Sequence, residues 1–171
     1  MTLNAGQVPT GSEWDDEFLA GAVIARGRRI TSSSAATGTT AVAVLRIDNV
    51  PLEAGRLYRV HTSSLLPDGT TSTDVCRVQI HYNSSGTATT ASGLMLGAVQ
   101  EMQIGNVTNS SGMDIETTYA PSANETGSFL LAFRLVQGTG STILFADGTT
   151  ITIDIYITDC GVDPGDTGTD L

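Results

Sequence analysis

Apolar residues recur at every second position along much of the chain, and this period constrains the fold more than any other feature of the sequence. The clearest example is residues 151–157 (ITIDIYI), where four isoleucines alternate with Thr152, Asp154 and Tyr156. A period of two places alternate side chains on opposite faces of a β-strand, so the isoleucines are expected in the core. No long run has the period of an amphipathic helix.

Turn residues divide this pattern into a succession of short predicted strands. The runs occupy residues 18–25, 28–32, 40–47, 57–62, 75–82, 128–136, 142–145 and 151–157, with weaker ones at 99–107 and 114–119. Breaks are predicted at Gly27, at Asp48-Asn49, at residues 66–69 (LPDG) and at Asp147-Gly148, the last as a hairpin turn. The sequence therefore predicts an all-β fold, an antiparallel β-sandwich or jelly-roll-like single domain.

The sandwich is predicted over residues 18–160, and the segments on either side have a different composition. Residues 1–17 contain Pro9, Gly11 and a run of acidic residues, and are interpreted as an extended N-terminal arm. Residues 161–171 (GVDPGDTGTDL) are interpreted as a short acidic C-terminal tail. The first residues lack the basic and apolar regions of a secretory signal, and no apolar stretch is long enough to span a membrane. The sequence predicts a protein made in a cytoplasm, with no membrane insertion.

The composition argues against a phosphate-binding surface. The 171 residues include 18 acidic residues and eight arginines but no lysine, which gives a net charge of −10 and a pI near 4.3. Affinity for nucleic acid comes from neutralising phosphates with basic side chains, so no nucleic-acid partner is expected. The 25 threonines and 15 serines favour β-structure rich in turns.

No constellation of residues predicts catalysis or a metal site. The two histidines, His61 and His81, fall in predicted strands, and no G-x-S-x-G motif is present. If their strands pair, the histidines are neighbours and form a pH-sensitive spot. Asp154 is interpreted as a solvated carboxylate on the polar side of its strand, and the acidic residues of the tail lack the pattern of a calcium loop.

The two cysteines, Cys76 and Cys160, are interpreted as reduced thiols in or near the core, with a disulfide as the alternative. Because the sequence contains no pattern typical of catalysis or of a metal site, we predict a protein that is not an enzyme, with no catalytic residue, no cofactor and no metal.

Four residues are predicted to make contacts with another chain. Arg26, Arg28 and Arg29 form the only basic cluster, and arginine pairs well with carboxylates, such as those of the acidic arm or tail of an adjacent subunit. The alternative is that they pair within their own chain or face solvent. Trp14, in the acidic arm, is expected to anchor that arm in a pocket of its own domain or of a neighbour.

Three segments carry a resemblance to a known group of proteins. They are residues 26–31, residues 44–65 (VLRIDNVPLEAGRLYRVHTSSL) and residues 74–93 (DVCRVQIHYNSSGTATTASG). They resemble a β-rich domain of tail-associated and other virion structural proteins of actinobacteriophages, mostly of unassigned function. The resemblance implies a location in the virion, after assembly in the host cytoplasm, and brings no catalytic residues.

Two functions are expected. The first is a non-enzymatic phage virion structural protein, either a minor tail or fibre-type protein or a capsid decoration protein. It would act through contacts with other virion proteins and with itself, as a trimer or other cyclic oligomer. The alternative is a receptor- or glycan-binding module used in host attachment. A shortage of aromatic residues, with one Trp, four Tyr and four Phe, counts against this alternative.

Overall fold

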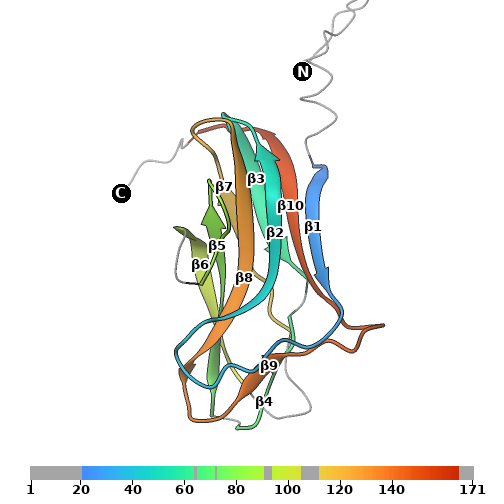
Figure 1. Ribbon diagram of the computed structural model, residues 1–171, viewed down its shortest axis with the longest axis vertical. Helices are drawn as coiled ribbons and strands as arrows, with labels where there is room; N and C mark the ends of the chain where they lie inside the picture. Colours follow the sequence, from blue (N-terminus) through green and yellow to red (C-terminus); the bar gives the residue numbers. More distant parts are fainter. Residues whose placement is uncertain (1–20, 64, 72, 91–93, 105–111, 166–171) are drawn as a thin grey trace, which may run out of the picture.

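The computed structural model describes residues 21–63, 65–71, 73–90, 94–104 and 112–165 (Figure 1). These residues form strands and connecting loops, with no helix among them. The strands are β1 (Val23–Arg29), β2 (Val42–Leu52), β3 (Arg56–Thr62), β4 (Pro67–Gly69), β5 (Val75–Asn83), β6 (Leu94–Gln103), β7 (Glu116–Tyr119), β8 (Glu125–Gln137), β9 (Thr142–Leu144) and β10 (Ile153–Val162).

The described strands form two four-stranded sheets that pack face to face, with a small third pair at one end. One sheet has the order β1-β10-β3-β7, the other has the order β2-β8-β5-β6, and β4 pairs with β9. All neighbours are antiparallel. Apart from the β4–β9 pair, this is the double-sheet arrangement of a jelly roll, which confirms the predicted fold class.

Alternation along the central strands builds the core between the two sheets. On β10, Ile153, Ile155 and Ile157 are buried inside the sandwich, as their period of two predicts, whereas Ile151 precedes the strand and is only partly buried. The second sheet contributes alternate residues of β5 and β8 to the same core: Cys76, Val78, Ile80 and Tyr82, and Phe129, Leu131, Phe133 and Leu135. The outer face of the second sheet also carries a small apolar cluster, formed by Ala88, Leu130 and Ala132.

Gly27 does not interrupt the first strand, so that prediction was wrong. It lies inside β1, opposite Ile155, and a Cβ at this position would stand 2.9 Å from Ile47 and 3.2 Å from Ile155. The glycine therefore allows close packing of β1 on the core instead of ending the strand. As a result, Arg26, Arg28 and Arg29 all belong to one strand.

Two other predicted turns also lie within strands. Asp48-Asn49 falls inside β2, where the pairing with β8 shifts between Ile47 and Val50 and Asn49 has a φ of 59°. This is a β-bulge, for which a short polar residue tolerates the left-handed backbone. Residues 67–69 of the predicted LPDG turn form β4.

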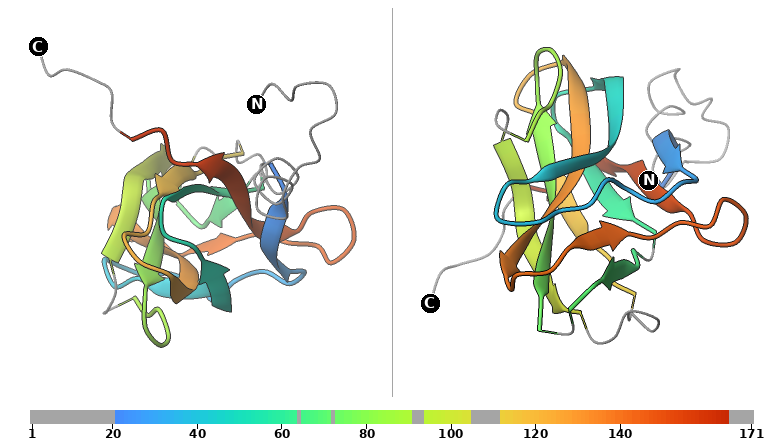
Figure 2. Two further views of the ribbon diagram at one scale, coloured as in Figure 1. Left: turned by 90° about the horizontal axis from the view of Figure 1, so that it is seen from above. Right: turned by 60° about the horizontal axis from the view of Figure 1, so that its bottom comes forward.

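The turn at Asp147-Gly148 exists, but it does not close a hairpin. β9 pairs with β4, whereas β10 pairs with β1 and β3, so the two strands that flank this turn belong to different sheets. Asp147 Oδ1 accepts hydrogen bonds from the amides of Thr149, Thr150 and Ile151, and these bonds lower the pKa of its carboxyl. Both views in Figure 2 show this loop (orange) projecting from the sandwich.

A cluster of tyrosines links the two sheets through residues of β5, β7 and β8. The hydroxyls of Tyr82 and Tyr119 donate hydrogen bonds to the same oxygen, Glu125 Oε1, at 2.6 and 2.7 Å. Burial raises the pKa of both tyrosines, and the bonds to Glu125 raise it further. The Tyr82 ring occupies the space above Gly127, where a Cβ would stand 2.3 Å from the ring. Gly127 is therefore needed for the packing of this cluster.

A buried ion pair joins β3 to the end of β10. Arg56 Nε and one terminal amino group of Arg56 donate to the two carboxylate oxygens of Asp159, at 2.7 and 3.0 Å. The side chains are only 7% and 5% exposed. Asp159 Oδ1 also accepts the amide of Gly161, at the position where the pairing of β10 with β3 becomes irregular. The pair thus fixes a bulge at the edge of the core.

Candidate interaction face

The outer side of the β1-β10-β3-β7 sheet carries the charged residues that the sequence singled out. Arg26 lies directly opposite Tyr156, Tyr156 opposite His61, and His61 opposite Glu116, so one row of side chains crosses all four strands. We call the outer side of this sheet, with Arg26, Arg28, Arg59, His61, Glu116, Asp154 and Tyr156, the arginine face. Figure 1 shows β1 (blue) at the end of this sheet, beside β10.

Asp154 lies at the centre of the charged part of this face and is buried. Arg26 Nε and a terminal amino group of Arg26 donate to Asp154 Oδ1 at 3.0 and 2.8 Å, and Arg28 Nε donates to the same oxygen at 2.8 Å. Thr152 Oγ1 donates to Oδ2 at 2.5 Å. The Asp154 side chain is 2% exposed, so the prediction that it is solvated was wrong. Two arginines share one carboxylate, which leaves an excess positive charge on the surface.

The guanidinium groups above Asp154 remain accessible. The side chains of Arg26 and Arg28 are 40% and 49% exposed. Arg28 uses only its Nε for Asp154, and its two terminal amino groups have no partner in the described part of the chain. Such a group presents two parallel donors, which suits a carboxylate.

The two rings of the row stack on each other instead of forming an open platform. The ring centroids of Tyr156 and His61 are 5.0 Å apart with an interplanar angle of 15°. On the other side of Tyr156, the guanidinium carbon of Arg26 lies 5.0 Å from the ring centroid. Both faces of Tyr156 are therefore occupied, and a sugar ring cannot stack on it without displacing a neighbour.

A weaker ion pair lies near His61. Arg59 approaches Glu116 at 4.0 Å, and both side chains are exposed. Burial lowers the pKa of His61, the charge of Arg59 lowers it further, and Glu116 opposes this shift. The charged form of His61 is therefore disfavoured on this face.

Arg29 differs from the other two arginines of the cluster. Its guanidinium group donates to the backbone carbonyls of Thr31, Ser32 and Val44 at 2.8–3.0 Å. It therefore holds the chain that leaves β1 against β2. The structure brings together Arg26 and Arg28 and directs Arg29 elsewhere. Trp14, the fourth predicted contact residue, lies outside the described residues.

The two histidines are not neighbours, because β3 and β5 belong to different sheets, so that hypothesis was wrong. His81 is buried on the outer side of β5, where its Nε2 lies 2.6 Å from the side-chain nitrogen of Gln79. Burial lowers the pKa of His81. The cysteines are also apart: Cys76 is buried in the core, Cys160 is exposed, and both are free.

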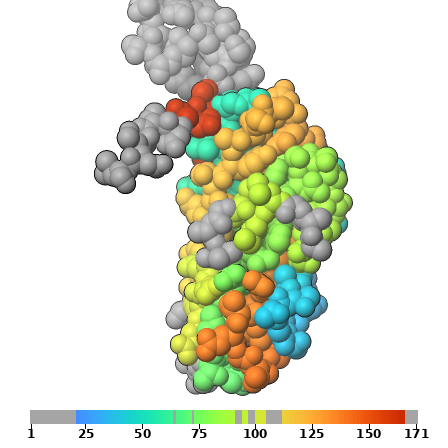
Figure 3. All heavy atoms as spheres, turned by 90° about the vertical axis from the view of Figure 1, so that its left-hand side faces the viewer, coloured from blue at the N-terminus to red at the C-terminus, as the bar shows by residue number. Residues whose placement is uncertain are grey.

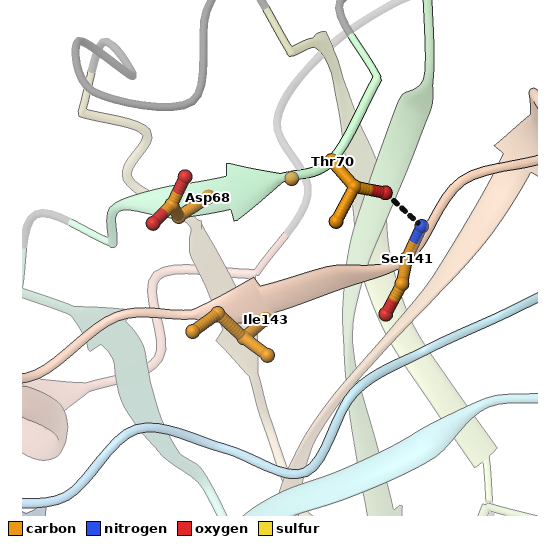
Figure 4. Close-up of a pocket in the computed structure, with 5 residues that line it drawn as sticks. Asp68, Thr70, Ser141 and Ile143 are labelled. Atoms are coloured by element: carbon orange, nitrogen blue, oxygen red, sulfur yellow. Dashed lines mark hydrogen bonds between the residues drawn. The ribbon is translucent and has the colours of Figure 1, made fainter.

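Two pockets in the described part of the chain contain acidic residues: one is lined by Glu53, Tyr58 and Asp159, and the other lies between β4 and β9. The one between β4 and β9 is lined by Asp68, Gly69, Thr70, Ser141 and Ile143. Its polar groups already hold the two strands together, since the Ser141 amide donates to Thr70 Oγ1 at 2.9 Å (Figure 4). The described residues contain no group of three or more His, Cys, Asp or Glu that could hold a metal ion.

Figure 3 looks onto the side of the molecule formed by β5 and β6 and shows an elongated body, with β9 (orange) and the link from β1 to β2 (blue) side by side at its lower end. Among the described residues, no helix is long and apolar enough to cross a membrane.

Comparisons with known proteins identify no family for this chain. No family model and no curated protein matches the chain. One similar solved structure is the CBM22-1 xylan-binding domain of Xyn10C from Paenibacillus barcinonensis, with 7% identity and a TM-score of 0.41 over 84% of this chain and 98% of that one. Another is a chain of infectious bursal disease virus, Gx strain, with 10% identity and a TM-score of 0.32 over 84% of this chain and 38% of that one. Similarity at this level does not indicate a function.

Proposed function

We propose that this protein is a non-enzymatic structural component of a bacteriophage particle that acts through protein–protein contacts. It would be a minor tail or fibre-type protein or a capsid decoration protein. The observation that carries the proposal is the arginine face: a chain with a net charge of −10 concentrates Arg26, Arg28 and Arg59 on one outer sheet face. Such local charge favours recognition of an acidic protein surface.

Two further observations support this function. The jelly roll is an architecture of viral capsid domains as well as of lectins, so the fold is compatible with a virion protein. The resemblance of residues 26–31, 44–65 and 74–93 to phage virion proteins points to the same setting. The stacking of Tyr156 supports protein contact over sugar binding on this face, because His61 and Arg26 occupy both faces of its ring.

A receptor- or glycan-binding module is the second candidate, and one pocket favours it. Beside β10, Ser63, Thr150 and Thr152 surround a depression of about 290 Å³ with Leu66 and Ile151. Hydroxyl groups beside small apolar surfaces are suited to a sugar, although the volume is at the lower limit for a ligand site. A glycan array tests this candidate, and binding that is lost in Thr150→Ala would favour it over assembly.

The main proposal is tested on particles. Phage particles purified by density gradient from the host that carries this gene should contain the protein when their components are analysed by mass spectrometry. Purified protein should also bind particles assembled without it, and the double variant Arg28→Gln/Arg59→Gln, which leaves Arg26 paired with Asp154, should bind at least tenfold more weakly. The control is Arg46→Ala, which removes an exposed arginine from the other sheet. Absence from the particles, together with no binding to them, would refute the proposal.

A further inference from the structure

We propose that the arginine face binds residues 13–17 (EWDDE) of a second copy of this chain, which add along the open edge of β1. This inference rests on the proposed function, because it names the contact through which copies assemble. Residues 13–17 lie in the arm that precedes the described residues. The argument uses the charges of the two partners, their spacing, the open strand edge and the apolar surface beneath it.

The charges of the segment and the face are complementary. Residues 13–17 carry four carboxylates in five positions, a large part of the net charge of −10. The face offers the excess charge of two arginines that share Asp154, with both terminal amino groups of Arg28 free in the described part of the chain. Copies with a high negative charge repel one another, so a contact between opposite local charges is the kind that can bring them together.

The spacing of the charges also agrees. In an extended segment, Glu13, Asp15 and Glu17 lie on one side and are about 6.8 Å apart. Arg26 and Arg28 have the same separation, because they are alternate residues of β1. A strand that adds to a sheet in register presents alternate side chains on the same face as its neighbour. The three carboxylates can therefore lie beside the two arginines.

β1 has an edge for such a strand. It is the first strand of the order β1-β10-β3-β7 and pairs on one side with β10, while the described residues place no strand on its other side. An exposed edge presents unpaired amides and carbonyls that another chain can use. Twenty residues precede Gly21, and they span up to roughly 66–72 Å when extended, which is enough for the arm to reach a neighbouring molecule.

The surface beneath this edge suits the tryptophan. Leu45 and Ile47 of β2 lie under β1 at Gly27 and remain partly exposed. In an added strand that directs Glu13, Asp15 and Glu17 outward, Trp14 points the opposite way, toward the sandwich. There its ring would cover Leu45 and Ile47. The position of Trp14 between the acidic residues is thus explained by the same contact.

The first test is the solution mass of the full chain by light scattering at two concentrations. We expect an oligomer in 50 mM NaCl that dissociates in 500 mM NaCl, because salt screens exposed charges. The arm variant Glu13→Arg/Asp15→Arg/Glu17→Arg leaves the described domain unchanged and should raise the dissociation constant at least tenfold. Arg28→Gln should have a similar effect while Arg26 still neutralises Asp154. A wild-type monomer, or an oligomer insensitive to both variants, overturns the inference.

The second test distinguishes a second copy from the same chain. Two differently tagged chains, both with Cys160→Ser, carry Asp15→Cys in one and Arg28→Cys in the other, and are mixed under mild oxidation. We expect a disulfide-linked heterodimer on a non-reducing gel, and none when Arg46→Cys replaces Arg28→Cys. A chain that carries both Asp15→Cys and Arg28→Cys and forms only an intrachain bond shows that the arm folds back on its own domain, which overturns the inference. A monomer that still binds particles would refute this inference and leave the proposed function in place.

Discussion

Replacing Arg56 by methionine should destabilise the protein strongly, because it leaves the carboxylate of Asp159 buried without its cation. Both side chains are almost fully buried and are joined by two hydrogen bonds of 2.7 and 3.0 Å. Removing one partner of a buried pair costs about 3–5 kcal/mol. In a domain of this size each kcal/mol lowers Tm by about 2–4 °C, so we expect a decrease of about 6–20 °C.

Thermal and urea unfolding at pH 7, followed by circular dichroism, measure this loss. The double variant Arg56→Met/Asp159→Asn removes the unpaired charge and should recover most of the stability, since the Gly161 amide keeps an acceptor. The control is Arg46→Met, because the exposed pair of Arg46 with Asp48 should contribute about 0–1 kcal/mol. A loss below about 1 kcal/mol for Arg56→Met, or a double variant no more stable than the single one, would show that the reasoning is wrong.

Three other changes have expected outcomes. Gly127→Ala should cost about 1–3 kcal/mol in urea unfolding, because its methyl group would collide with the tyrosine ring described above, whereas Gly38→Ala meets open space and should have little effect. A thiol reagent at pH 8 should modify Cys160 in the native protein and Cys76 only after unfolding, because burial raises the pKa of Cys76 to about 11. Rapid modification of both cysteines in the native protein would contradict this prediction. Stability should fall as the pH decreases through about 6.5, because the unfolded chain protonates His81 more readily than the folded one. His81→Gln should reduce that fall in unfolding curves measured at a series of pH values. An unchanged dependence of stability on pH would show that His81 is not responsible.

The sequence predicted the strands better than their pairing. Alternation located β5 and β10 because one face of each strand lies in the core, and burial selects apolar residues at every second position. Gly27 misled the prediction because a glycine that allows close packing looks the same in sequence as one that ends a strand. The residues of the predicted LPDG turn form β4 because β9, far along the chain, offers them a partner.

In the candidate site too, the sequence indicated the important residues but not which of them are in contact. Asp154 was identified as a polar residue on an alternating strand, and Arg26 and Arg28 as a basic cluster, but their contact joins positions 128 and 126 residues apart. Only the neighbouring placement of β1 and β10 brings them together, and strand order cannot be deduced from alternation alone. The row from Arg26 through Tyr156 and His61 to Glu116 was missed for this reason. The signal available was that each of these residues occupies a polar position of a period-two pattern.

The position of β10 determines when this fold can be completed during synthesis. β10 is made after the other nine described strands, yet it lies between β1 and β3 and provides three isoleucines to the core. A nascent chain that ends before residue 153 therefore has no partner for β1 and leaves β3 open on one side. Such chains would expose strand edges and core surface to aggregation and degradation. The first sheet can therefore be completed only after residues 153–162 have left the ribosome, and products that stop before β10 cannot form it.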